Sequence, residues 1–69
     1  MTREETIFKM TECANELYFH GDYDEAIVML QSIDRLCDSY GFDMPDEAID
    51  LNANLDEQFN TDVLTKKIK

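Results

Sequence analysis

The sequence is poor in basic residues, glycine and proline, and it contains no tryptophan. Six lysines and arginines stand against 16 aspartates and glutamates, for a net charge of −10 over 69 residues. Arg35 is the only lysine or arginine between Met10 and Thr65. Proteins grip nucleic-acid phosphates through these two residue types, so we expect no direct binding of nucleic acid. The surplus of carboxylates either favours a protein partner with a basic surface or serves only to keep a small protein soluble.

Long apolar runs are also missing. The sequence has no stretch of 18 apolar residues, so we expect no membrane-spanning segment. The first residues lack the basic-then-apolar layout of a signal peptide, which predicts a cytoplasmic protein. A chain of this length forms one small domain, and scarce glycine and proline favour helices within it.

Residue sets for catalysis or metal binding are absent from the sequence pattern. His20 is the single histidine, and Cys13 and Cys37 lie 24 positions apart without any paired CxxC spacing. We expect both cysteines to be buried free thiols, and a disulfide between them is the alternative. The two glycines are isolated and form no phosphate-binding loop. The sequence therefore predicts no enzyme, no cofactor and no metal site.

Apolar residues recur at helical spacing and predict an all-α fold, a small bundle of three helices in one domain. Thr2 and Glu5 have the spacing of a capping box at the start of the first helix. Gly21 and Gly41 are suited to end the first two helices, because glycine adopts the left-handed conformation freely. We expect Asp22 to cap the second helix with its carboxylate. The expected segments are helices at about 2–20, 22–40 and 45–59, then a tail or short fourth helix at 61–69.

Each expected helix has an apolar stripe that predicts its buried side. On the third helix we expect Ile49 and Leu51 at the borders of the stripe. The expected central positions are Ile7, Met10, Ala14, Leu17 and Tyr18 on the first helix, Ala26, Leu30, Ile33 and Cys37 on the second, and Ala48, Asn52, Leu55 and Phe59 on the third.

The turn between the first two helices reads Gly21-Asp22-Tyr23-Asp24-Glu25-Ala26. This segment, with the flanking apolar positions from about residue 7 to 40, resembles a tetratricopeptide repeat (TPR) present in a single copy. The resemblance implies an antiparallel helical hairpin of the kind that serves as a scaffold for protein binding. Asp38 departs from the pattern, because a proline usually closes such a repeat, and repeats of this kind normally occur in about three or more copies.

Nine residues are candidates for partner binding. Phe8 and Phe19 share one side of the first helix, where they either cover the edge of the third helix or contact a partner. Met29, Leu36 and Tyr40 form a second apolar stripe on the second helix, which favours a homodimer or another apolar contact. Exposed carboxylates are expected to form an acidic rim, and these are Glu12, Glu16, Asp50 and Glu57.

The pattern predicts a non-catalytic module, an adaptor or inhibitor, that binds another protein through helical apolar surfaces with an acidic rim. The alternative is a nucleic-acid mimic, whose carboxylate rows occupy the basic channel of a nucleic-acid-binding protein. Small acidic phage proteins that inhibit restriction, CRISPR or transcription resemble this chain in size and charge.

Overall fold

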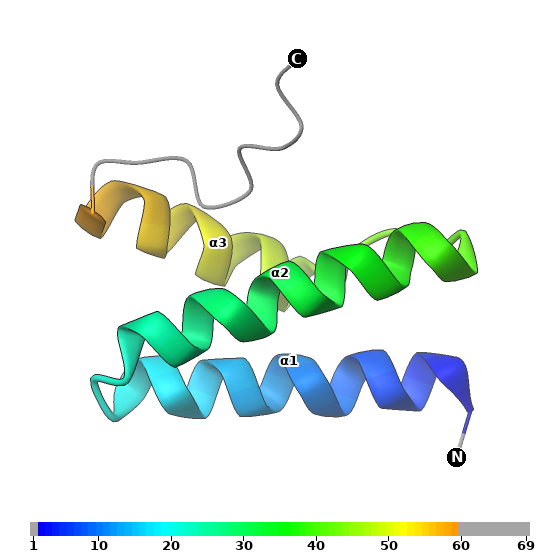
Figure 1. Ribbon diagram of the computed structural model, residues 1–69, viewed down its shortest axis with the longest axis horizontal. Coiled ribbons are helices and arrows are strands. Elements are labelled where there is room, and N and C mark those ends of the chain that lie inside the picture. Colours follow the sequence, from blue (N-terminus) through cyan, green and yellow to red (C-terminus); the bar gives the residue numbers. More distant parts are fainter. Residues whose placement is uncertain (1, 60–69) are drawn as a thin grey trace.

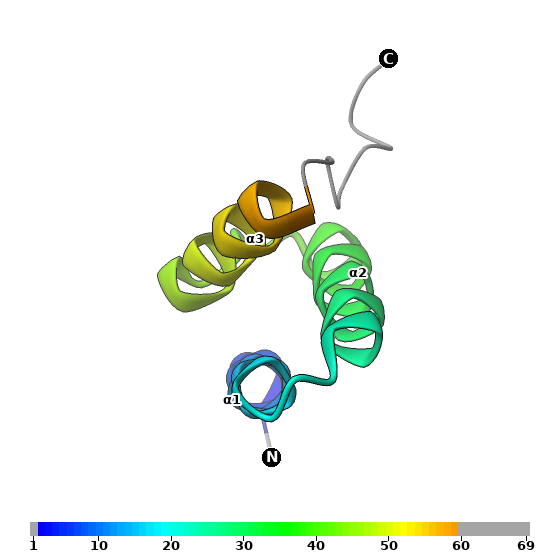
Figure 2. The same ribbon diagram turned by 90° about the vertical axis from the view of Figure 1, so that its left-hand side faces the viewer.

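Three helices and their two connections make up residues 2–59, the part of the chain that the computed structural model describes. Helix α1 spans Arg3–Phe19, α2 spans Tyr23–Tyr40 and α3 spans Asp46–Phe59. The first two run antiparallel, and α3 turns back along the direction of α1 (Figure 1). Seen from one end, the helices occupy the corners of a triangle (Figure 2). The prediction of a small all-α bundle is confirmed, whereas the expected tail or short helix at 61–69 lies outside the described residues.

Both turns follow from glycines in the left-handed conformation. Gly21 has φ 86° and Gly41 has φ 77°. The amide N–H that follows Gly21 donates to the Leu17 carbonyl at 2.8 Å, and the one that follows Gly41 donates to the Cys37 carbonyl at 2.8 Å. Each of these six-residue closures is accompanied by a hydrogen bond from the glycine N–H itself, to the Tyr18 carbonyl at 3.1 Å and to the Asp38 carbonyl at 3.3 Å. Together these bonds satisfy the last carbonyls of α1 and α2. The glycines therefore end both helices, as the sequence predicts.

The starts of α1 and α2 differ from one another. The Glu5 amide donates to Thr2 Oγ1 at 3.1 Å, and the Thr2 amide donates to Glu5 Oε1 at 2.9 Å, so the capping box is confirmed. Asp22 is the N-cap of α2 but its side chain makes no capping hydrogen bond, so that prediction is wrong. Its ψ of 67° departs from the extended conformation that Thr2 adopts at ψ 166°, and a capping side chain needs that conformation.

The core consists of nine buried apolar side chains, six from the α1–α2 hairpin and three from α3. The buried stripe of α3 contains Leu51, which was expected at a border. Asn52 is only half-buried and Phe59 is exposed, so the expected centre of this stripe is wrong at both positions. The buried set is Ile7, Ala14, Ala26, Leu30, Ile33, Cys37, Ala48, Leu51 and Leu55.

The buried side of α1 lies further round the helix than the sequence predicts. Thr11 is fully buried, and its hydroxyl donates to the Ile7 carbonyl at 2.9 Å. Cys13 is exposed, which corrects the expectation of a buried thiol. Successive residues lie about 100° apart around a helix, so a core centred between Ile7, Thr11 and Ala14 turns Cys13 outward.

Candidate functional site

Two phenylalanines stand out on the surface of α1. Phe19 is 81% exposed and Phe8 is 50% exposed. They are eleven positions apart, which is close to three helical turns, so they share one side of the helix. An 81% exposed ring gives little cover to the edge of α3, and that interpretation of Phe19 is wrong. Both rings are available to a partner.

Phe19 lies at a hollow between α1 and α3, which we call the α1–α3 hollow. Its volume is about 310 Å³. Leu51 supplies buried apolar surface from α3, while Asp50 and Glu47 add exposed carboxylates. The lining comprises Asn15, Tyr18 and Phe19 from α1 with Glu47, Asp50, Leu51 and Asn54 from α3.

Phe8 lies at a second hollow, near the start of α1, which we call the Phe8 hollow. It encloses about 330 Å³ against the connection between α2 and α3. Ile7, Phe42 and Pro45 line it with apolar surface, and Glu4 and Asp43 add carboxylates. Among the described residues that line the Phe8 hollow and the α1–α3 hollow, none is lysine or arginine.

A row of aromatic rings connects Phe19 to α2 and α3. Its ring meets Tyr18 with centroids 5.8 Å apart, and Tyr18 meets Tyr23 at 5.5 Å. Tyr23 in turn meets Phe59 at 5.6 Å, so the row runs from α1 through α2 to α3. The Tyr18 hydroxyl also lies 3.3 Å from Oε1 of Gln58, to which it donates. These contacts fix the position of α3 beside Phe19.

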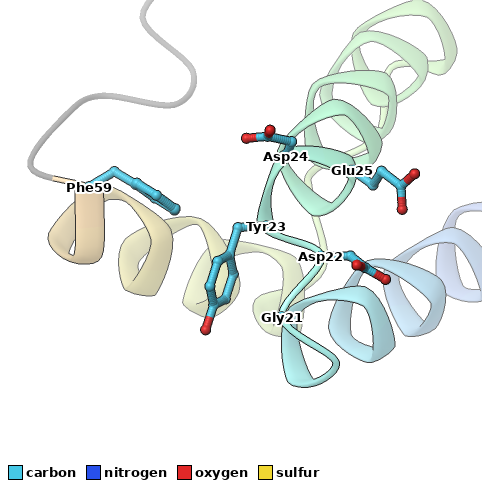
Figure 3. A pocket seen from close by; sticks show the side chains of 6 residues that line it. All are labelled: Gly21, Asp22, Tyr23, Asp24, Glu25 and Phe59. Carbon is cyan, nitrogen blue, oxygen red and sulfur yellow. The ribbon is translucent and has the colours of Figure 1, made fainter.

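A third hollow, of about 380 Å³, lies at the start of α2 beside Tyr23 and Phe59 (Figure 3). It contains three carboxylates from the turn, but Figure 3 shows Asp22 and Glu25 pointing to the side opposite Phe59. Their oxygens do not converge on one point. This hollow therefore lacks the arrangement of ligands that would hold a cation.

The second apolar stripe of α2 is largely used inside the molecule. Met29, Leu36 and Tyr40 are half-buried and pack against the core. The Arg3 guanidinium lies 4.9 Å over the Tyr40 ring, and Phe42 meets the same ring at 5.7 Å. This stripe presents less free apolar surface than the two phenylalanines of α1.

The four predicted rim carboxylates are all exposed. Glu12 and Glu16 lie one and two turns beyond Phe8 on α1. On α3, Asp50 lines the α1–α3 hollow, and Glu57 lies two turns further along the same side. The structure thus brings Phe19 and Asp50 to one hollow, and it places Glu12 and Glu16 along α1 and Glu57 further along α3.

Several lining residues were not predicted from the sequence. Asn15 and Asn54 are uncharged polar residues, and no pattern in the sequence marks them as lining a hollow. Leu51 was assigned to a border of the α3 stripe, and Phe42 falls between the second and third expected helices. Their roles depend on the angle at which α3 crosses α1, which no local pattern specifies.

The two cysteines lie in different surroundings. Both cysteines are free, with Cys37 buried, as predicted, and Cys13 exposed. Burial, reinforced by the nearby Asp38 and Asp43 carboxylates, raises the pKa of the Cys37 thiol, and its Sγ lies 3.9 Å from the Asp43 carbonyl. Within residues 2–59, no three histidine, cysteine or acidic side chains form a group that could hold a metal ion. Over the same residues, no helix has the length and apolar character required to cross a membrane.

Comparison of the chain with protein-family models, curated proteins and solved structures finds no match. The resemblance of the α1–α2 turn to a tetratricopeptide repeat accordingly stays a prediction.

Proposed function

We propose that this chain is a non-catalytic protein-interaction module, an adaptor or inhibitor, that binds an apolar segment of a basic partner beside α1 and α3. The observation that carries the proposal is Phe19, a large ring left 81% exposed at a hollow that Leu51 lines and two carboxylates flank. An exposed aromatic ring that a partner can bury is typical of binding anchors.

The acidic surface supports a basic partner. Apart from Asp34 and Asp56, every described carboxylate is exposed. Carboxylates around an apolar contact accelerate encounter with a basic surface and disfavour acidic competitors. Exposed carboxylates alone also suit the second candidate, a nucleic-acid mimic that occupies a basic channel. A mimic would use the carboxylates of both helices together and would have no need of Phe19.

Affinity capture from the lysate of the native host, followed by mass spectrometry, would identify the partner. Two variants then separate the candidates: Phe19→Ala, and a quadruple variant that replaces Glu12, Glu16, Asp50 and Glu57 by glutamine or asparagine. For the adaptor, Phe19→Ala speeds dissociation by about tenfold or more, while the quadruple variant mainly slows association. Binding should also persist in about 0.5 M salt, where the Debye length is only a few Å.

For the mimic, the quadruple variant loses binding and Phe19→Ala binds as the wild type does. Val28→Ala is the matched control, because Val28 is 60% exposed on α2 and lies away from both hollows. Circular dichroism of each variant establishes that its helices are intact. If Phe19→Ala leaves the affinity for the captured partner unchanged, the adaptor proposal is wrong.

A further inference from the structure

Resting on the proposed function, we infer that the partner segment is a basic amphipathic helix, which lies along α1 and places one large apolar side chain against Phe8 and another against Phe19. The one feature that selects this occupant is the pairing of two apolar anchors, each beside its own hollow, with carboxylates between and around them.

The spacing of the anchors suits a helix. Eleven positions at 1.5 Å per residue place Phe8 and Phe19 about 16 Å apart along the axis of α1. Eleven residues of a partner helix likewise span about 16 Å and return to the same side, because this is close to three turns. A partner helix that crosses α1 at the common angle of about 20° can therefore reach both anchors with side chains eleven positions apart.

Charge selects a basic segment. Glu12 and Glu16 are exposed on α1 between the two anchors. Glu4 and Asp43 line the hollow at Phe8, and Glu47 and Asp50 line the hollow at Phe19. A helix that carries lysine or arginine between and beside its apolar anchors would meet a carboxylate at each of these places.

The same charges disfavour a second copy of the chain on this surface. Each copy carries a net charge of −10, and two α1 faces in contact would oppose carboxylates with carboxylates. Complementarity therefore favours a basic helix over self-association through Phe8 and Phe19.

Synthetic probe peptides test the inference directly. The first is an alanine–lysine helix of about 18 residues with two leucines eleven positions apart, long enough to span both anchors. A second peptide has the same composition, but its leucines lie about six positions apart and so on different sides of the helix. A third carries a central proline, which prevents a continuous helix. Fluorescence anisotropy at physiological ionic strength gives each affinity for the full chain.

We expect the first peptide to bind about tenfold or more tightly than either control, and to lose about tenfold in affinity on Phe8→Ala or on Phe19→Ala. Val28→Ala should leave its affinity unchanged. Replacing one leucine of the peptide by alanine should make it insensitive to the variant at one phenylalanine and leave it sensitive to the other. Because the leucine is replaced in the peptide, this test requires no protein variant beyond the two phenylalanine substitutions.

Equal binding of the first two peptides would show attraction by charge alone and overturn the inference. Tighter binding of the proline peptide would assign an extended segment instead. A dimer in sedimentation equilibrium that Phe8→Ala and Phe19→Ala both dissociate would assign a second copy. If no peptide binds while the captured partner still depends on Phe19, the helix is wrong and the proposed function stands. If the captured partner ignores Phe19, both fail.

Discussion

The α1–α2 hairpin and α3 are held in the structure by different means. The hairpin has a capping box at its start, a left-handed glycine at each of its two helix ends, and six of the nine buried apolar side chains. Helix α3 contributes Ala48, Leu51 and Leu55 to the core and is joined to the hairpin by the aromatic contacts of Tyr23 and Phe59. Local sequence therefore determines the hairpin, whereas packing places α3, and the α1–α3 hollow lies between the two.

The largest expected effect is on the centre of the hairpin. Leu30 is fully buried on α2, so Leu30→Ala should lower the free energy of unfolding by about 3 kcal/mol, from lost apolar burial and the cavity left behind. Val28→Ala on the same helix should change it by less than about 0.5 kcal/mol, because Val28 is 60% exposed. Urea denaturation followed by circular dichroism measures both.

The same pair of regions can be separated by Leu55→Ala, which removes a fully buried side chain from α3. If α3 is held by packing alone, hydrogen exchange of its amides should accelerate more than exchange of the α1 and α2 amides. Equal acceleration in all three helices would mean instead that the hairpin and α3 unfold as one unit.

A smaller effect is expected at the first turn. Gly21→Val should cost on the order of 1 kcal/mol or more, because a β-branched residue is forced to φ 86°. A Cβ at this position meets nothing within 4 Å, so the cost comes from the backbone alone. Gly21→Asn, which tolerates the left-handed conformation, should cost less. Equal melting temperatures for the wild type and Gly21→Val would show that the left-handed conformation at Gly21 does not contribute to the stability of the hairpin.

The smallest expected effect on stability is at the thiols, where the rates of modification differ clearly. With Cys13→Ser, only the buried Cys37 is left to react, and iodoacetamide should modify it about tenfold or more slowly than it modifies Cys13 in a Cys37→Ser variant. Similar rates would place Cys37 at the surface. Mass spectrometry over time gives both rates.

The pH dependence has a definite sign. Folding raises the pKa of Cys37, so the folded state retains a proton that the unfolded state releases. The contribution of Cys37 to stability is fully present below the unfolded thiol's pKa of about 8.5, and it should fall as the pH rises above that value. Cys37→Ala should lessen that decline, which urea denaturation across a pH series would detect.

Much of the fold could be predicted from single residues. Gly21 and Gly41 act through their own backbone conformation and Thr2 through a hydrogen bond to its side chain three residues on, so local sequence is enough to predict all three. The errors concern which side of a helix is buried. A stripe through Ala48, Asn52 and Leu55 is as regular as one through Ala48, Leu51 and Leu55, and only the crossing angle of α3 decides between them.

The candidate site was predictable in part for the same reason. The exposure of Glu12, Glu16, Asp50 and Glu57 follows from their charge and position. The exposure of Phe19 does not, because a phenylalanine beside an apolar stripe is more often covered. Asp34 shows the converse, since it is 3% exposed on α2 although a charged residue is normally expected at the surface. Long-range packing, which no local pattern encodes, determines the exposure of both Phe19 and Asp34.

The row of rings from Phe19 to Phe59 also gives the molecule a spectroscopic property. The sequence has three tyrosines and no tryptophan, so tyrosine emission dominates its intrinsic fluorescence. Two of the three emitters, Tyr18 and Tyr23, belong to the row, and Tyr18 touches Phe19 and lines the α1–α3 hollow. Anything that settles against Phe19 changes the surroundings of that fluorophore. Binding at the hollow should therefore change the tyrosine fluorescence, which can be measured without a label.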